Sequence, residues 1–226
     1  MKKIKYRIQY SKTGLTRFTS HLDVLRAINR TIRRSGLPIA FSMGFNPVPR
    51  LSFGPPLPLG IESEAEFFDL ELTADLSKEE VFHALKQALP PGLQVIKVGR
   101  LVHKVQSLTA MINSIVYQFI LVAKVKQCSV QLEDWFERLW ESAELNVIKN
   151  TKSGKKSINL RPFWKSYKLA FTENDIILFA IEVEFGPRGT IRPDDFCSLL
   201  SKDFQVERVI RKEVFSRAGE CCKKVL

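Results

Sequence analysis

The residues best suited to chemistry are arginines near the N-terminus. Arg26, Arg30 and Arg33 follow one another at spacings of four and three residues, which places them on one face of a helix. Guanidinium groups bind phosphate oxygens in a bidentate manner, and an ordinary solvated helix face would mix charge signs. The pattern therefore predicts contacts with phosphate groups. Two further arginines of the same basic region are Arg17 and Arg34.

A loop rich in proline and glycine follows, and its residues 41–53 are called the motif loop below. In it Phe45 could stack on a base, Asn46 could hydrogen-bond to a base edge, and Arg50 could bind a phosphate. Its prolines and glycines predict a rigid loop rather than a flexible linker. In the alternative interpretation, Phe45 and Phe53 are core side chains that hold the loop in place.

His21 and Asp23 come closest to a catalytic pair, as a general base and the carboxylate that would orient it. Side chains two residues apart on a helix diverge, however. Asp23 is better explained as part of an N-terminal helix cap with Ser20, and His21 as a polar contact. The sequence also lacks the common nucleophile, zinc and phosphate-loop motifs. We therefore favour a binding role, and an enzyme that uses His21, Asp23 and Arg50 is the alternative.

A second basic stretch lies between residues 149 and 168, where seven lysines and arginines occur without an acid. Phe163, Trp164 and Tyr167 are interleaved with them, and this composition is typical of surfaces that bind single-stranded RNA. Alternatively, residues 152–156 form a mobile basic loop and Trp164 belongs to the core. The candidate RNA contacts here are Lys155, Lys156, Arg161 and Lys165.

Residues 186–193 form a turn rich in glycine and proline that leads into a helix. Exposed amide groups at a helix N-terminus attract anions. Arg188 and Arg192 lie in this turn and add positive charge to it. We therefore include both arginines among the candidate RNA contacts.

Hydrophobic periodicity places these residues on two successive βαββαβ units. Helices are expected from Ser20 to Gly36 and at 77–88, 130–141 and 192–200. Strands are expected at 3–11, 38–42, 65–73, 93–102, 114–126, 144–149, 157–161, 164–172, 175–186 and 204–215, with a hairpin turn at Glu173-Asn174. This order predicts an α+β fold of two tandem ferredoxin-like domains, residues 1–105 and residues 112–226, the second carrying a basic insertion.

Composition limits the class of protein. The 226 residues are 45% hydrophobic and 26% charged, which argues against disorder over most of the length. No stretch approaches the roughly 18 apolar residues of a membrane span, and the N-terminal residues lack the apolar segment of a signal peptide. We therefore expect a soluble, cytoplasmic protein.

The net charge of +11 is distributed unevenly along the chain. Residues 1–50 carry +10, whereas residues 51–99 carry −5. A charge that only kept the protein soluble would not be concentrated in this way. The distribution favours an anionic partner.

The four cysteines, Cys128, Cys197, Cys221 and Cys222, show no C-x-x-C spacing. Zinc sites and iron–sulfur clusters need three or four such ligands together. We therefore expect reduced thiols and no metal or cofactor of the chain's own. The adjacent pair Cys221-Cys222 could alternatively join a site shared with a partner.

Residues 17–70 resemble the radical-SAM-linked protein family, whose members are fused to radical SAM proteins or encoded beside them, often near a ribonuclease of the E/G type. The segment 189–193 (GTIRP) is also similar to this family. The matching motif residues are His21, Asp23, Arg26, Ser42, Gly44, Phe45, Asn46, Pro47, Arg50, Ser52, Phe53, Gly60, Glu62 and Ser63.

The resemblance implies a radical SAM protein as partner, with a ribonuclease E/G-type protein as a further one. This chain lacks the radical SAM cysteine motif, so the partner would supply the iron–sulfur cluster and S-adenosylmethionine. At fold level the pattern is also similar to CRISPR repeat-processing proteins and pseudouridine synthases. The glycine-rich RNA loop of the former and the catalytic aspartate motif of the latter are absent here.

These observations predict an RNA-binding accessory protein that presents tRNA or rRNA to a radical SAM partner for modification or processing. In a first alternative, the acidic residues 62–80 and the motif loop dock a radical SAM protein, and RNA plays no part. In a second, the chain is an RNA-processing enzyme by itself.

Overall fold

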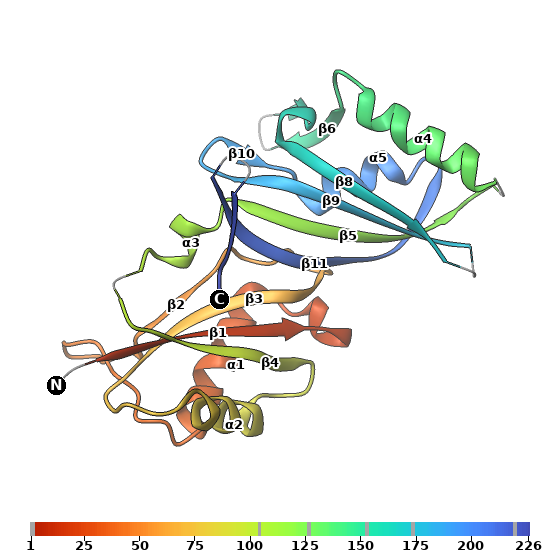
Figure 1. Ribbon diagram of the computed structural model, residues 1–226. Coiled ribbons are helices and arrows are strands. Elements are labelled where there is room, and N and C mark those ends of the chain that lie inside the picture. The colour runs from red at the N-terminus through yellow and green to blue at the C-terminus, as the bar shows by residue number, and fades with distance from the viewer. Residues whose placement is uncertain (1–2, 104, 126–127, 152–153, 173–174, 219–220) are drawn as a thin grey trace. The chain divides into compact units, whose positions relative to one another are not determined.

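The computed structural model describes residues 3–103, 105–125, 128–151, 154–172, 175–218 and 221–226 (Figure 1). The chain divides into two compact units. Unit 1 comprises Met1–Ile112 and Val214–Leu226, and unit 2 comprises Asn113–Glu213. Both contain helices and mostly antiparallel strands, so the expected α+β class is confirmed. No helix among the described residues is long and apolar enough to cross a membrane.

Unit 1 is a sheet covered on one face by two helices. Its elements are β1 (Ile4–Lys12), the 3-10 helix η1 (Gly14–Phe18), α1 (His21–Arg34), β2 (Leu51–Phe53), β3 (Glu62–Leu72), α2 (Lys78–Ala88), β4 (Leu93–Leu101), α3 (Leu108–Met111), the end of β11 (Phe204–Ala218) and β12 (Cys221–Lys224). Four strands pair antiparallel in the order β4–β1–β3–β2. Figure 1 shows α1 and α2 on one face of β1, β3 and β4.

The core of unit 1 lies between that face of the sheet and the two helices. Tyr6 and Ile8 of β1 contribute to it, as the alternation in the sequence predicts, and they meet Ile28 of α1 and Val81 of α2. Polar residues alternate with these apolar ones along the strand, which predicts that the opposite face of β1 is open to solvent. Arg7 lies on that face, but it is only 1% exposed. Unit 1 therefore buries both faces of its central strand.

The second strand of unit 1 differs from the expectation. A strand was expected at 38–42, but that segment forms only isolated bridges, Ile39 with Leu72 and Phe41 with Pro49. The regular strand is β2, which pairs with β3. Strand formation depends on finding a partner along its length, and the sequence of 38–42 does not reveal that only single residues of it find one.

Unit 2 repeats the order of elements with an added hairpin. Its elements are β5 (Ser114–Ala123), α4 (Ser129–Glu141), β6 (Asn146–Thr151), β7 (Gly154–Asn159), the 3-10 helix η2 (Arg161–Phe163), β8 (Trp164–Phe171), β9 (Ile176–Gly186), β10 (Gly189–Thr190), α5 (Pro193–Leu200) and the first part of β11. β8 and β10 pair with β9, which pairs with β5, and β5 neighbours β11.

The core of unit 2 is rich in aromatic rings. Phe119 of β5, Phe179 of β9 and Phe196 of α5 are fully buried and contact one another. Phe136 of α4 packs on Phe179 with ring centroids 4.5 Å apart. Trp164 is 2% exposed, so it belongs to this core, as one of the two interpretations of the basic stretch held.

The basic stretch itself is more regular than expected. One interpretation expected a mobile basic loop over residues 152–156. Instead β6 and β7 pair antiparallel, with Asn146 opposite Asn159 at one end and Thr151 opposite Gly154 at the other. Cross-strand pairing gives this segment its backbone partners despite its polar composition. Lys152 lies outside the described residues, and so do Glu173 and Asn174, where a hairpin turn was expected.

The end of the chain belongs to unit 1, so unit 2 is shorter than the expected domain of residues 112–226. β12 pairs with residues 215–218 of β11. The carbonyl of Val225 then accepts a hydrogen bond from Arg7 Nη1 (3.1 Å), and a side chain at Gly99 would collide with that of Leu226. These contacts within unit 1 draw the last residues away from the expected C-terminal domain.

Candidate nucleic-acid interface

Helix α1 begins at a side-chain cap that the sequence predicts. The Ser20 hydroxyl accepts a hydrogen bond from the Asp23 amide (3.2 Å) and donates one to Asp23 Oδ2 (2.6 Å). That hydrogen bond from Ser20 is the main cause that lowers the pKa of Asp23. The helix ends before Gly36, whose positive φ of 70° suits a residue without a Cβ. These local signals fix the position of the arginines that follow.

The three arginines lie on the solvent side of α1. Relative to Arg26, the side chain of Arg30 is rotated by about 40° around the helix axis, and that of Arg33 by about 20° in the opposite sense. The row of three is about 10 Å long. All three side chains are exposed, whereas Val24 and Ile28 lie on the opposite, buried side. Burying such apolar side chains contributes roughly 1.5–3 kcal/mol each and holds the arginine face outward.

One part of the expected apolar face of α1 is wrong. Helical spacing in the sequence places Leu22, Leu25, Ile28 and Ile32 on one apolar face, which predicts that all four are buried. Leu22 is instead 62% exposed and Leu25 is half-buried. Val24 is buried instead. Leu22 lies close to the arginine row around the helix axis, because it precedes Arg26 by four residues.

The motif loop is closed at its base by backbone hydrogen bonds. The Ser42 amide donates to the Val48 carbonyl (2.9 Å), and the Arg50 amide donates to the Ala40 carbonyl (2.9 Å). The Ser42 hydroxyl accepts from the Val48 amide (3.1 Å), and the Ala40 amide donates to the Glu71 carbonyl of β3 (2.8 Å). The expected rigid loop is therefore tied both to itself and to the sheet.

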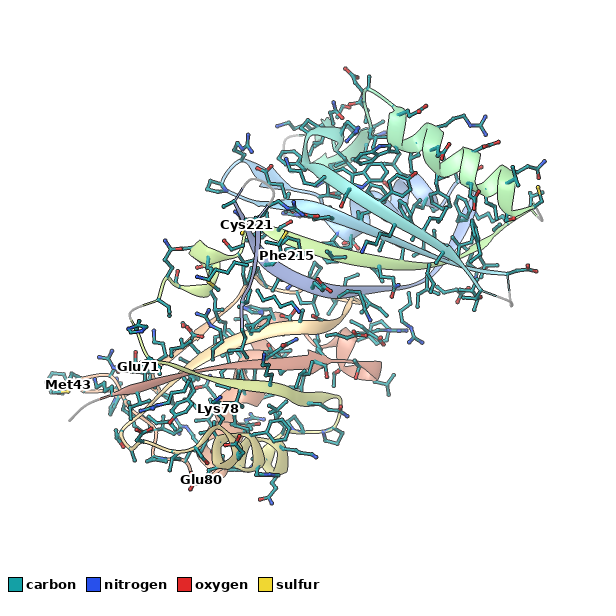
Figure 2. The ribbon with its side chains drawn as sticks, in the orientation of Figure 1. Met43, Glu71, Lys78, Glu80, Phe215 and Cys221 are labelled. Atoms are coloured by element: carbon teal, nitrogen blue, oxygen red, sulfur yellow. The ribbon has the colours of Figure 1, made fainter. Side chains whose placement is uncertain are left out.

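The end of the loop projects from this base into solvent. Figure 2 shows Met43 at the outer end of the loop, farther out than Glu71 of β3. Phe45 is completely exposed, and the exposed residues Asn46 and Pro47 follow it. Phe53 by contrast packs against Phe68, with ring centroids 5.9 Å apart. Phe53 is thus a core anchor of the loop, and that interpretation is wrong for Phe45.

Arg50 is held at the base of the loop and points toward a carboxylate. Its Nη1 lies 3.7 Å from Glu71 Oε2, and its Nε donates to the Phe41 carbonyl (3.4 Å). The side chain is 40% exposed, so one edge of the guanidinium reaches solvent. Arg50 both braces the loop and carries positive charge at its surface.

A groove separates α1 from the motif loop. It encloses about 500 Å³ and is lined by Arg26, Asn29, Arg30, Arg33, Val48, Pro49, Leu51 and Phe53. The helix supplies a wall of guanidinium and amide groups, called the arginine wall below. The loop and β2 supply an apolar wall. None of the lining residues carries a carboxylate.

Glu62 and Gly60 of the family motif contact η1, which precedes α1. Glu62 Oε1 accepts from the Gly14 amide (3.1 Å) and lies 3.5 Å from Arg17 Nη1, while Lys12 Nζ donates to the Thr19 carbonyl (2.9 Å). The Ser63 hydroxyl accepts from the Ala65 amide, and the Gly60 amide donates to the Arg17 carbonyl. Ser52, half-buried, lies in β2 opposite Asp69. Glu62, Gly60 and Lys12 thus hold residues 14–19, which lead into α1. Like Ser52 and Ser63, they are not among the residues that line the groove.

Arg17, Arg34, His21 and Asp23 are not part of the groove lining. The Arg17 guanidinium contacts Glu62 and lies over the Phe18 ring (4.7 Å), and Arg34 Nη2 donates to the Ala88 carbonyl (2.9 Å). The Asp23 carboxylate accepts from Ser20 and from Arg26 Nη1 (3.1 Å). No hydrogen bond joins His21 to Asp23 among the described residues, which agrees with the expected divergence of the two side chains.

In unit 2 three of the six candidate cations are engaged within the unit. Lys165 Nζ and Arg188 Nη2 lie 2.7 Å and 2.5 Å from the Glu184 carboxylate. They lower the pKa of Glu184, with the hydrogen bond from Lys165 as the largest cause. The Arg161 guanidinium stacks on the Trp140 ring at 4.2 Å. Unit 2 therefore offers less free positive charge than its sequence indicates.

Three other candidates of unit 2 are exposed. Lys155 and Lys156 lie on β7, and Arg192 precedes α5, where its amide donates to Asp195 Oδ2 (3.3 Å). Lys149, on the neighbouring strand, forms an ion pair with Asp195 (2.5 Å). The exposed cations of unit 2 are thus spread over separate elements.

Sequence reasoning missed the apolar wall and Asn29. A signal for Asn29 was present, because it precedes Arg33 by four residues and so shares its helix face. Val48, Pro49 and Leu51 were visible only as parts of a proline-rich loop. Their facing α1 depends on how the loop folds back onto β3, which no local pattern encodes.

Among the described residues, no group of three or more histidine, cysteine, aspartate or glutamate side chains could hold a metal ion. The cysteines are free. Burial raises the pKa of the Cys197 thiol to about 11. Cys221 and Cys222 are exposed on β12.

Comparison with known proteins gives a family and a fold. A family model described as "Uncharacterized protein conserved in bacteria (DUF2344)" matches residues 5–193. No curated protein matches the chain. Among solved structures, a chain in "Crystal Structure of a Cbf5-Nop10-Gar1 Complex" aligns with a TM-score of 0.51 at 10% identity. The alignment covers 92% of this chain and 48% of that chain, so this chain spans about half its length, and the likeness is one of fold.

Proposed function

We propose that this chain, which belongs to the DUF2344 family of uncharacterised bacterial proteins, is an accessory protein that binds RNA. Unit 1 makes the main contacts with the RNA, through its groove. The observation that carries the proposal is the arginine wall, where Arg26, Arg30 and Arg33 line a groove of about 500 Å³ that no carboxylate lines. Guanidinium groups in such a setting bind phosphate oxygens.

The charge of the first 50 residues supports the same proposal. Their net charge of +10 attracts an anionic polymer over distances of about a Debye length. Arg30 and Arg33 form no ion pair among the described residues, so their charge is available to a ligand. Arg26 shares its charge with Asp23, and we expect it to contribute less.

The proposed setting is the modification or processing of tRNA or rRNA. The resemblance of residues 17–70 to the radical-SAM-linked family supports a radical SAM protein as the partner, which would bring S-adenosylmethionine and an iron–sulfur cluster, with a ribonuclease E/G-type protein as a further partner. We also propose that each unit is a ferredoxin-like domain, since β4–β1–β3–β2 and β11–β5–β9–β8 follow the same order. In this account the chain holds RNA and the partner supplies the chemistry.

A second candidate function is docking of the radical SAM protein without RNA. Four apolar side chains near η1 and the start of α1 are exposed: Leu15, Phe18, Leu22 and Leu59. The hydrogen bond from the Gly60 amide to the Arg17 carbonyl brings Leu59 to this region. Grouped exposed apolar side chains are typical of protein interfaces.

Charge reversal in the groove tests the proposed RNA contact. The change is Arg30→Glu with Arg33→Glu, and its matched control is Lys78→Glu with Lys86→Glu on α2, which alters the net charge equally at exposed positions away from the groove. RNA affinity is measured by fluorescence anisotropy across a range of salt concentrations. We expect the groove variant to bind RNA about 100-fold more weakly, because two phosphate contacts are lost. For the same reason, the slope of log association constant against log salt concentration should become less steep by about 1.4.

The control variant should keep most of its affinity and nearly all of its salt slope. Thermal melting confirms that both variants fold. Equal losses in the two variants would mean that the net charge, not the groove, attracts RNA. Absence of RNA binding by the natural protein would favour the docking candidate.

A further inference from the structure

The two walls of the groove differ in chemistry, and this difference limits what kind of RNA fits. We infer that the groove takes single-stranded RNA, with phosphates on the arginine wall, bases toward the motif loop, and Phe45 as a stacking residue. This inference rests on the proposed RNA-binding function and specifies its substrate class.

The apolar wall of the groove indicates that the ligand presents apolar surface as well as phosphate. Val48, Pro49, Leu51 and Phe53 face the same groove as the arginines. A ligand that fills the groove must therefore present phosphate on one side and apolar surface on the other. In a duplex the base faces are stacked inside and the outer surface is sugar and phosphate. A single strand exposes its base faces and so matches both walls.

The exposure of Phe45 indicates that its ring is available to stack on a base. Its ring is completely exposed, although burying a phenylalanine side chain is worth roughly 1.5–3 kcal/mol. Single exposed apolar residues are common, but here Met43, Val48 and Phe41 of the same loop are exposed as well. Three residues after Phe45, Val48 of the same loop lines the basic groove. An aromatic ring held in solvent on such a loop is suited to stacking on a base.

The rigidity of the motif loop keeps the Phe45 ring in its exposed position. The hydrogen bonds of Ser42 and Arg50 fix its base, and Gly44 adopts a φ of 129° that an L side chain rarely accepts. The ring of Phe45 is thus presented by a pre-organised segment, which loses little conformational entropy when a base binds. A flexible loop would not keep the ring from packing on nearby apolar residues.

The length of the arginine row sets the number of nucleotides at the groove. The row spans about 10 Å. With one phosphate per guanidinium group, the three arginines contact about three phosphates. The short row is consistent with a local single-stranded segment such as a loop, bulge or end.

The test compares one RNA of about 12 nucleotides, without self-complementarity, as a single strand and annealed to its complement. Affinity is measured by fluorescence anisotropy with the full chain. We expect the natural protein to bind the single strand at least about tenfold more tightly. Phe45→Leu keeps an apolar side chain but removes the ring, and should weaken single-strand binding by about tenfold while leaving duplex binding unchanged. Phe45→Trp should retain single-strand affinity.

The outcomes separate this inference from the proposed function. Equal affinity for single strand and duplex, or unchanged single-strand affinity in Phe45→Leu, would overturn the inference. The proposed function would still stand in that case if Arg30→Glu with Arg33→Glu weakened both ligands. Failure of the natural protein to bind either RNA would overturn both.

Discussion

Arg7 and Asp69 form an ion pair that no local sequence pattern reveals. Arg7 Nε and Nη2 donate to the two carboxylate oxygens of Asp69 at 2.8 and 3.0 Å, and both side chains are 2% exposed. Arg7 Nη1 also donates to the Val225 carbonyl. The pair is therefore satisfied on several sides, as a buried pair must be to repay its desolvation.

Removal of the Asp69 charge should destabilise unit 1 strongly. Asp69→Asn leaves the Arg7 guanidinium buried without a counter-charge, and we expect the free energy of unfolding to fall by about 3 kcal/mol. The matched control is Asp75→Asn, whose ion pair with Arg100 is solvent-exposed and should contribute no more than about 1 kcal/mol. Urea denaturation measures both. Equal effects of the two substitutions would show that burial adds nothing to the Arg7 pair.

At the scale of residues, the sequence predicts what is local and misses what is distant. The capping partners Ser20 and Asp23 are three residues apart, and so are Ser77 and Glu80, which form a capping box at the start of α2. Arg7 and Asp69 are 62 residues apart and meet only because β1 pairs with β3.

At the scale of elements, helices are predicted more closely than the strand beside the groove. α1 carries its own cap, its own stop and its own arginine spacing, so its position follows from residues 20–36. β2 exists because Leu51–Phe53 pair with β3. The candidate site thus has one wall that the sequence predicts and one that depends on tertiary pairing.

Strand β9 carries a carboxylate that pairs with two of the candidate cations. Lys165 of β8 and Arg188, just after β9, both contact Glu184 of β9. These interactions favour the ionised carboxylate and lower its pKa below the ordinary value of 4.5. Glu184 therefore stabilises the folded state above that value, and the contribution disappears as the pH falls through the lowered pKa of the folded state.

Glu184→Gln should reveal this contribution through its pH dependence. We expect the variant to be less stable than the natural protein by about 1 kcal/mol near neutral pH, with the difference shrinking as the pH falls well below 4.5. Denaturant unfolding at about pH 7 and about pH 3.5 measures the difference. The exposed Glu133→Gln on α4 serves as control and should show little change. A difference that stays constant with pH would contradict the role given to the ion pairs.

At the scale of the whole molecule, two basic regions are candidates for RNA binding, one in unit 1 and one in unit 2. In unit 1 the arginine wall is continuous and lines a groove. In unit 2 Lys165, Arg188 and Lys149 contact carboxylates, and Arg161 stacks on Trp140. The sequence shows similar clusters of charge in both halves, because it does not reveal which cations fold against acids. The contacts favour unit 1.

Cross-linking maps the RNA contact directly. An RNA of about 12 nucleotides that contains 4-thiouridine is irradiated with the full chain, and the modified peptides are identified by mass spectrometry. We expect cross-links in residues 21–34 and 41–53, with Phe45 among the modified positions, because these segments form the groove and the end of the motif loop. Cross-links confined to residues 146–171 of unit 2 would contradict the assignment of RNA binding to the groove.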